Sequence, residues 1–343
     1  MNNIKKIGLS ALAGSLAMVS ANAVDYSMSG GLTAIATTQD DPNTVANSGK
    51  GLSMKTDLAL AASGELDNGF TIDYSMSIDT AGALSNSSSQ MKVGMGSLGS
   101  FHINNEGGSY ANAIDDMTPN AYSGAWDGIS VGTNPTFFGT AVNGGSVTYR
   151  IPAQEFEGLT INAGIDYDPN QSVGGATKGS IDVTADSGTA LVVQLASDTG
   201  IEIGAGIEML KQTSGTKNED GENVTGYVKY SNGGLVLSYQ QAYANTAHSD
   251  SNVAGDDGLD KEAMFAGVAY TMGDLTVSYG VSEYDVKAGS DTVALLTEEM
   301  SSFQAAYVIG AMTVSAAMSE TDNVAGITAT TYNENTLAVS FAF

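Results

Sequence analysis

Residues 70–79 are FTIDYSMSID, in which large apolar side chains occupy every even position and small or polar side chains every odd one. Because successive side chains of a β-strand point to opposite faces, this alternation predicts a strand with one apolar and one polar face. The pattern returns along almost the whole chain, most clearly at 159–167, 201–209, 275–282 and 312–318. The sequence therefore predicts an all-β protein.

Two kinds of connector separate the predicted strands. The short ones contain Gly, Asn and Asp, which supply the positive φ that tight hairpins need; they are 67–69, 97–99, 155–158, 198–200, 232–234, 273–274 and 310–311. The long, polar ones lie at about 39–50, 80–88, 107–142, 169–187, 213–223, 247–261, 286–299 and 320–330. Seven short turns and eight long loops alternate strictly, which predicts sixteen strands with both chain ends on the side of the short turns.

An up-and-down transmembrane barrel needs this arrangement, with an even number of antiparallel strands, short turns at one end and long loops at the other. Closing the sheet satisfies every backbone hydrogen-bonding group and removes the edges. Two soluble sandwiches are the alternative, because their strands also alternate, but no linker divides the chain. A barrel of sixteen strands is too wide for side chains to fill, so we expect an aqueous channel.

The first 23 residues have the organisation of a secretory signal peptide. Lys5 and Lys6 precede a short apolar run, and Ala21-Asn22-Ala23 matches an A-x-A cleavage site. Cleavage there would leave 24–343 as a single barrel domain. No later stretch reaches about 18 uninterrupted apolar residues, the length expected of a membrane helix. The chain has no cysteine and therefore no disulfides.

The charge balance excludes one class of partner. The chain carries 38 acidic and 12 basic residues, a net charge of −26, whereas nucleic-acid binding requires a basic face. Enzymatic chemistry also lacks its usual groups: there are two histidines, no cysteine, no G-x-S-x-G and no phosphate-binding loop. We expect no enzyme activity and no cofactor. Calcium at the acidic loops is the alternative, since hard cations bind carboxylates, but no ordered ligand spacing occurs.

Residues 107–142 form the longest interval without strand alternation. They contain two of the five prolines, the only tryptophan (Trp126) and the acidic pair Asp115-Asp116. Long loops without regular structure tend to be functional or disordered, and this one is too apolar for a disordered linker. We therefore predict that it folds into the space enclosed by the strands. An ordinary surface loop is the alternative.

Three stretches resemble the general porins of Gram-negative bacteria, in the alphaproteobacterial style. LALAASGELDNGFTIDYSMS (58–77) is similar to the second hairpin of that family, and KVGMGSLGSFHINNEGG (92–108) to its fourth and fifth strands. The last strand ends on Phe343, which resembles the signal read by the assembly machinery of outer-membrane barrels. The resemblance implies a homotrimer of sixteen-stranded barrels among outer-membrane lipid and lipopolysaccharide, with the third loop folded inward as a constriction.

The resemblance also implies acidic loop residues facing basic residues on the barrel wall. The acidic candidates are Glu106, Asp115, Asp116 and Asp127. Strand alternation places the basic or polar candidates on the lumen face, namely Lys55, Lys92, His102 and Arg150. Arg150 is the only arginine, so the basic side is weaker than in the family. Fixed charges in a narrow aqueous pore bias which ions enter, and this acidic excess should favour cations.

The sequence thus predicts an outer-membrane porin for passive diffusion of ions and small hydrophilic solutes. A substrate-specific channel is one alternative, although one Arg and one Trp offer little material for a binding track. An acidic surface-layer or adhesin-type β-protein is another, but it explains neither Phe343 nor the alternation of turns and loops. A barrel enzyme would need a catalytic His and a nucleophile together at one rim, and the sequence indicates no such pair.

Overall fold

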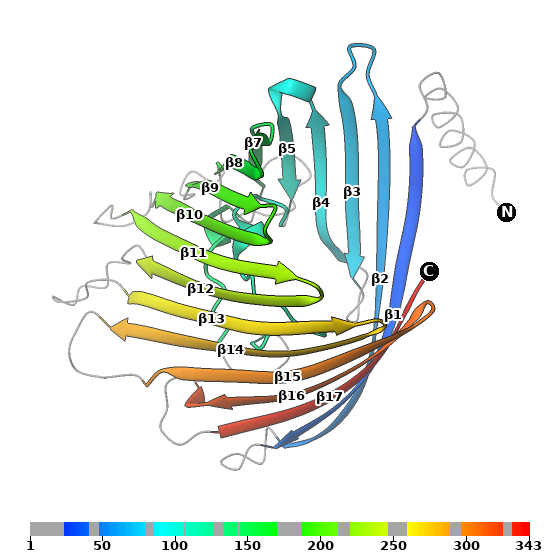
Figure 1. Ribbon diagram of the computed structural model, residues 1–343, viewed down its shortest axis with the longest axis vertical. Helices are drawn as coiled ribbons and strands as arrows, with labels where there is room; N and C mark the ends of the chain where they lie inside the picture. Colours follow the sequence, from blue (N-terminus) through cyan, green and yellow to red (C-terminus); the bar gives the residue numbers. More distant parts are fainter. Residues whose placement is uncertain are drawn as a thin grey trace, which may run out of the picture.

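In the computed structural model the chain forms one antiparallel sheet that closes on itself (Figure 1). The structure describes residues 24–40, 48–79, 85–105, 107–126, 133–142, 145–169, 187–211, 220–245, 259–288, 296–324 and 331–343. Closure comes from the first strand, which pairs with both the second and the last. The predicted signal peptide, 1–23, lies outside the described residues, as do Glu106 and Asp127.

The strands follow one another around the barrel in chain order. They are β1 (Asp25–Asp40), β2 (Gly49–Glu65), β3 (Thr71–Asp79), β4 (Ser85–Gly94), β5 (Ser100–Asn105), β6 (Val147–Arg150), β7 (Gln154–Phe156), β8 (Leu159–Asp168), β9 (Ser187–Ser197), β10 (Ile201–Lys211), β11 (Gly221–Asn232), β12 (Leu235–Asn245), β13 (Leu259–Met272), β14 (Leu275–Ala288), β15 (Glu298–Ile309), β16 (Met312–Asp322) and β17 (Thr331–Ala342). Where the structure describes the connections, they contain short 3₁₀ turns, namely η2 (Gly96–Leu98), η3 (Asn112–Ile114) and η4 (Thr140–Val142). Among the described residues, no helix is long and apolar enough to cross a membrane.

The barrel has sixteen strand positions, which confirms the predicted number. β6 and β7 both pair with the same edge of β8 and form one position with a break in it. Ile151 still donates its N–H to Ala163 at 3.0 Å, but Pro152 has no N–H to continue the ladder. The strand resumes beyond it with its register shifted by one residue.

The short turns lie where the sequence placed them. Asn232 ends β11, and Gly233 and Gly234 reverse the chain at φ of 56° and 89°, backbone angles that side chains disfavour. Short turns also join β2 to β3, β4 to β5, β7 to β8, β9 to β10, β13 to β14 and β15 to β16, as the sequence predicted. Because each strand is antiparallel to the next, all these turns lie at one end of the barrel.

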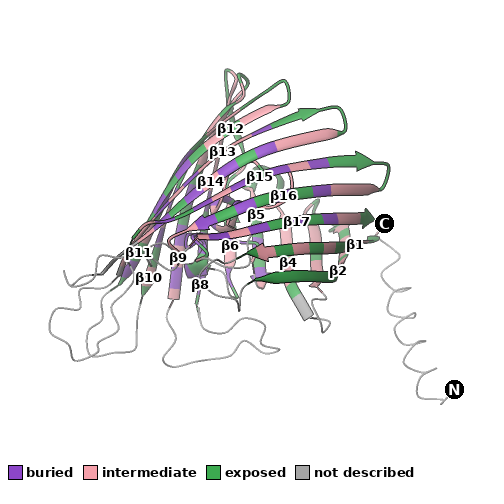
Figure 2. Cartoon of the chain, turned by 90° about the horizontal axis from the view of Figure 1, so that it is seen from below, coloured by how far each residue is buried: buried purple, intermediate pink, exposed green. Residues whose placement is uncertain are grey.

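The two faces of the sheet differ as a membrane barrel requires. On β12, Tyr239 and Tyr243 are exposed, whereas Gln240 and Ala242 between them are buried. Figure 2 shows this alternation of exposed and buried bands along the later strands. A soluble sandwich would bury its large apolar side chains. Here they lie on the outer, exposed face, so the sandwich alternative is wrong.

Apolar residues of the long connector between β5 and β6 are packed against the opposite, polar face. Tyr110, Ile114, Phe138 and Val142 form a cluster with wall residues that include Val192. A second cluster joins Phe137 and Trp126 to side chains of β12 to β14. The described parts of this connector, 107–126 and 133–142, are therefore held by the sheet.

Candidate permeation site

The predicted wall residues share one face of the sheet. Direct cross-strand pairs link Asp73 to Lys92, Lys92 to His102, His102 to Thr148 and Thr148 to Asp166. The Lys92 ammonium lies 3.7 Å from the Asp73 carboxylate. His102 Nε2 lies 2.8 Å from a serine hydroxyl on its own strand. Strand alternation thus gathered these side chains into one row around the wall.

Lys55 forms ion pairs with two carboxylates, one on its own strand and one on the neighbouring strand. Its Nζ lies 3.3 Å from Asp57 and 3.2 Å from Asp79. The lysine and Asp57 side chains remain about half exposed to solvent, at 44% and 51%. The pairing carboxylates therefore belong to the wall, not to the long connector.

Arg150 packs against the start of the long connector. Its guanidinium carbon lies 4.3 Å from the centre of the Tyr110 ring, a cation–π geometry. The Tyr110 hydroxyl donates to Gln194 Oε1 at 2.6 Å. Burial raises the pKa of Tyr110, and this effect exceeds the opposing one of Arg150. The only arginine thus fixes an end of the connector.

Asp166 anchors the same end through the backbone. Its two carboxylate oxygens accept the N–H groups of Tyr110 and Ala111, each at 2.9 Å, and Thr148 donates its hydroxyl to one of them. The carboxylate is fully buried. Buried charge is tolerated only where hydrogen bonds replace water, and here three donors do so.

The acidic pair of the connector is partly used to brace it. Asp116 accepts the N–H of Thr118 at 2.8 Å and the indole N–H of Trp126 at 3.0 Å. Asp115 accepts the N–H of Asp116 at 2.7 Å. Burial raises the pKa of Asp115 to about 6, which the neighbouring Asp116 charge reinforces. Since the wall lysines pair with wall carboxylates, these two acids have other partners than the predicted basic residues.

The middle of the connector is held by side chains that were not among the predicted site residues. Gln240 Oε1 accepts the Met117 N–H at 2.8 Å, and its amide donates to the Ile114 carbonyl at 2.8 Å. Gln304 accepts the N–H groups of Tyr122 and Ser123 at 2.8 and 3.1 Å. A signal was present: on the same face of each strand, two residues before and after the glutamine, the sequence carries only Ser or Ala (Ser238, Ala242, Ser302 and Ala306).

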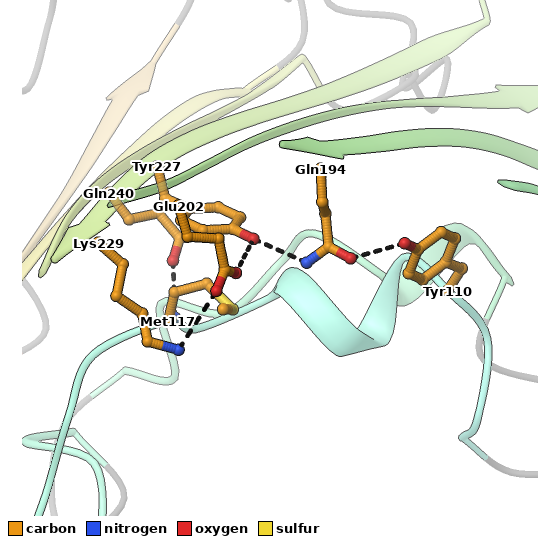
Figure 3. A network of polar contacts seen from close by, with 7 residues as sticks. All are labelled: Tyr110, Met117, Gln194, Glu202, Tyr227, Lys229 and Gln240. Atoms are coloured by element: carbon orange, nitrogen blue, oxygen red, sulfur yellow. Dashed lines mark hydrogen bonds and ion pairs between the residues drawn. The ribbon is translucent and has the colours of Figure 1, made fainter. Parts of the chain in front are cut away.

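Further polar contacts extend this support along the wall (Figure 3). Gln194 donates to the Tyr227 hydroxyl at 2.7 Å, and Tyr227 donates to Glu202 at 2.6 Å. Lys229 completes the chain, 3.9 Å from Glu202. Figure 3 shows these side chains lying between the strands and the ribbon of the connector. Glu202 and Lys229 are therefore paired with each other within the barrel wall.

A cavity of about 830 Å³ lies between the connector and four strands of the wall. Ala121, Tyr122 and Ser123 border it on one side, and residues of β1, β2, β16 and β17 on the other. Lys55 and Asp57 are among the lining side chains. In the part of the chain that the structure describes, no group of three or more His, Asp or Glu side chains is arranged to hold a metal ion.

A closed antiparallel barrel with an apolar outer face and a polar inner face defines the class of transmembrane β-barrels. The family model for Gram-negative porins matches residues 8–343, so the chain belongs to that family and to the outer membrane. No curated protein sequence matches it.

Solved porins share the fold at low sequence identity. An anion-selective porin from Comamonas acidovorans has 14% identity and a TM-score of 0.66, covering 94% of this chain and 100% of its own. OmpF of Salmonella typhi, in complex with daunomycin, has 14% identity and a TM-score of 0.65, covering 93% and 97%. OmpT of Vibrio cholerae, in its trimer form, has 12% identity and a TM-score of 0.63, covering 94% and 100%. The sixteen-strand prediction and the family resemblance are confirmed.

Proposed function

We propose that the protein forms a water-filled channel through which ions and small hydrophilic solutes diffuse passively. One observation carries the proposal: wall side chains of β8, β12 and β15 bind the backbone of the connector between Tyr110 and Tyr122 and hold it against the polar face. In a closed barrel that face encloses the lumen, so the connector narrows the channel. The family and the fold are those of channels rather than enzymes. The channel needs no cofactor, and no calcium at its acidic loops.

We further propose a mild cation preference. Asp57, Asp73 and Asp79 lie on the polar face, and Asp115 and Asp116 add their charge from the connector. Glu106 and Asp127 would add to this acidic excess, while Lys55, Lys92, His102 and Arg150 offset part of it. Fixed charge inside low-dielectric walls acts over the whole lumen, so its net sign biases ion entry.

The proposed assembly is a homotrimer in contact with outer-membrane lipid and lipopolysaccharide. OmpT of Vibrio cholerae, which has the same fold, was solved in a trimer form. Phe343 is exposed at the end of the last strand and is the residue that the barrel-assembly machinery would read. A substrate-specific channel, which would need a binding track along the lumen, is the second candidate.

The test is current through purified protein in a planar bilayer with a salt gradient across it. We expect large steps, in groups of three, with a reversal potential that favours cations. Asp115→Asn combined with Asp116→Asn should reduce that preference more than the matched control, Asp67→Asn with Asp198→Asn, which neutralises two exposed carboxylates of the short turns. Folded protein that carries no current would overturn the channel. Current without cation preference would overturn the charge assignment alone.

A further inference from the structure

An apolar cavity of about 460 Å³ opens on the outward face of β11 to β14, on the side of the sheet away from the connector. Its border includes Val228, Leu237, Tyr239, Ala266, Val268 and Tyr279. The small Ala266 pairs across the sheet with Tyr239 on one neighbouring strand and with Val281 on the other. Because the larger side chains rise on both sides of this alanine, the outer surface is hollowed here.

An acidic cavity of about 540 Å³ adjoins the apolar one on the same four strands. Its border includes Gln241 and Met264, which pair with each other across the sheet. They lie two positions along the chain from Tyr239 and Ala266 of the apolar cavity, on the same face. Successive positions on one face of a strand are about 7 Å apart. The two cavities therefore form one continuous groove along the strands.

Three carboxylates border the acidic cavity, those of Glu262, Glu283 and Asp285. Glu262 and Asp285 are direct cross-strand neighbours, and Glu283 is exposed. Like charges in this position repel each other, so a cation between them would be stabilised. The ion pairs of the described residues involve neither Glu283 nor Asp285. This end of the groove thus presents negative charge outward.

The groove crosses the boundary of the apolar band on the outer face. On β14, Val277, Tyr279 and Val281 point outward toward the short turn, whereas Glu283 and Asp285 point outward toward the long loop. The lipid-facing band of a membrane barrel is apolar and ends where charged residues begin. The apolar cavity therefore lies at the level of the acyl chains, and the acidic cavity lies at the level of the headgroups.

We propose that this groove binds one lipid whose headgroup carries a primary amine. An acyl chain fills the apolar cavity, and the ammonium lies among Glu262, Glu283 and Asp285. An ammonium offers three donors, and its hydrogen bonds to carboxylates are stronger than those between neutral groups. An anionic headgroup, or the same face of a second copy, would instead bring negative charge against these carboxylates. The inference rests on the outer-membrane location and is independent of the channel.

The test is native mass spectrometry of the refolded protein in neutral detergent, with equal amounts of dioleoyl phosphatidylethanolamine and dioleoyl phosphatidylglycerol. The two lipids have the same acyl chains, and only the first carries an amine. We expect its adducts to be about twofold to fivefold more abundant, the effect of one exposed ion pair. Glu283→Gln with Asp285→Asn should remove most of this preference.

Glu320→Gln with Asp322→Asn is the matched control, because it makes the same change of charge on the outward face of β16, outside both cavities. It should keep the preference for the amine lipid. Ala266→Phe fills the apolar cavity and should lower the adducts of both lipids. Ala316→Phe makes the same substitution at an exposed position of β16 and should leave them unchanged.

Three results would overturn this inference. One is equal binding of the two lipids by the unmodified protein. Another is an equal loss of preference in both double variants, which would reflect the overall charge of the protein. The third is association of two copies that Ala266→Phe abolishes, which would assign the groove to a second copy. Adducts are counted without any current, so absence of conductance would overturn the proposed channel alone.

Discussion

At the scale of single residues, Asp115 is where pH should act on the connector. Burial raises its pKa from 3.8 to about 6, so the folded protein holds this proton more tightly than the unfolded chain. Stability that depends on this group is therefore greatest in acid and falls as pH rises from about 4 through 6. We expect Asp115→Asn to raise the free energy of unfolding at pH 7.5 by about 1 kcal/mol after solvent screening.

The measurement is the thermal midpoint of the folded form at pH 4 and pH 7.5. At pH 4 both Asp115 and its asparagine replacement are neutral, so the difference should vanish. Asp116→Asn is the adjacent contrast: its carboxylate accepts from Trp126, and an amide N–H turned toward that indole would weaken the contact. It should destabilise at pH 7.5. A stabilising effect of Asp115→Asn that persists at pH 4 would rule out ionisation as its cause.

The sequence could place the wall residues but not the partners of the connector. Alternation alone put Lys92, His102 and Arg150 on one face, because strand geometry fixes that face locally. The role of Gln304 depends on Tyr122, which is 182 positions away in the chain. A contact of that kind follows from barrel closure and the path of the connector, and no local pattern encodes it.

At the scale of elements, β10 makes room for the connector. A side chain at Gly206 would overlap the ring of Phe138 and approach Ile114. Gly206→Val should therefore push Phe138 out of its cluster and lower the free energy of unfolding by about 1–3 kcal/mol, the usual cost of overpacking. Displacement of the connector should also change single-channel conductance. Thermal unfolding and bilayer recordings measure the two effects.

Gly226→Val on β11 is the control for this prediction. A side chain there would meet only a backbone oxygen at 3.8 Å, and Gly226 is exposed. Stability and conductance should match those of the unmodified protein. If both variants behaved alike, the loss would reflect valine in a strand rather than contact with Phe138.

Strand positions were predictable because a period of two is a local property of the chain. The same argument could not divide β6 from β7, since only the position of Pro152 within a ladder reveals the break. The period of two also could not predict the fold of the connector, because Tyr110 and Phe138 follow no strand or helix pattern. Only their packing against the barrel wall explains where they lie. Inward glycines such as Gly164 and Gly206, which leave space for those rings, were the overlooked signal.

At the scale of the whole molecule, stability depends on the seam between the first and last strands. β1 pairs with β17 over ten residue pairs, Gly31 to Asp40 on β1, so neither strand is left as an open edge of the sheet. Beyond these pairs, Gly30 and Phe343 exchange two backbone hydrogen bonds, of 2.8 and 2.9 Å. Because an open edge leaves backbone groups unpaired in the membrane, loss of this seam should affect the entire barrel.

Gly30→Val tests the seam directly. A Cβ at this position would lie 2.7 Å from the Phe343 ring and 2.9 Å from Leu58, so both side chains must move and the ring can no longer lie against Gly30. We expect the boiling-dependent shift on a gel, which reports the folded barrel, to occur at a lower temperature. Refolding in detergent from denaturant removes any contribution of the assembly machinery. Gly51→Val, where a Cβ meets nothing within 4 Å, should leave that temperature unchanged. Equal temperatures for both variants would show that packing of the Phe343 ring on Gly30 contributes nothing to closure.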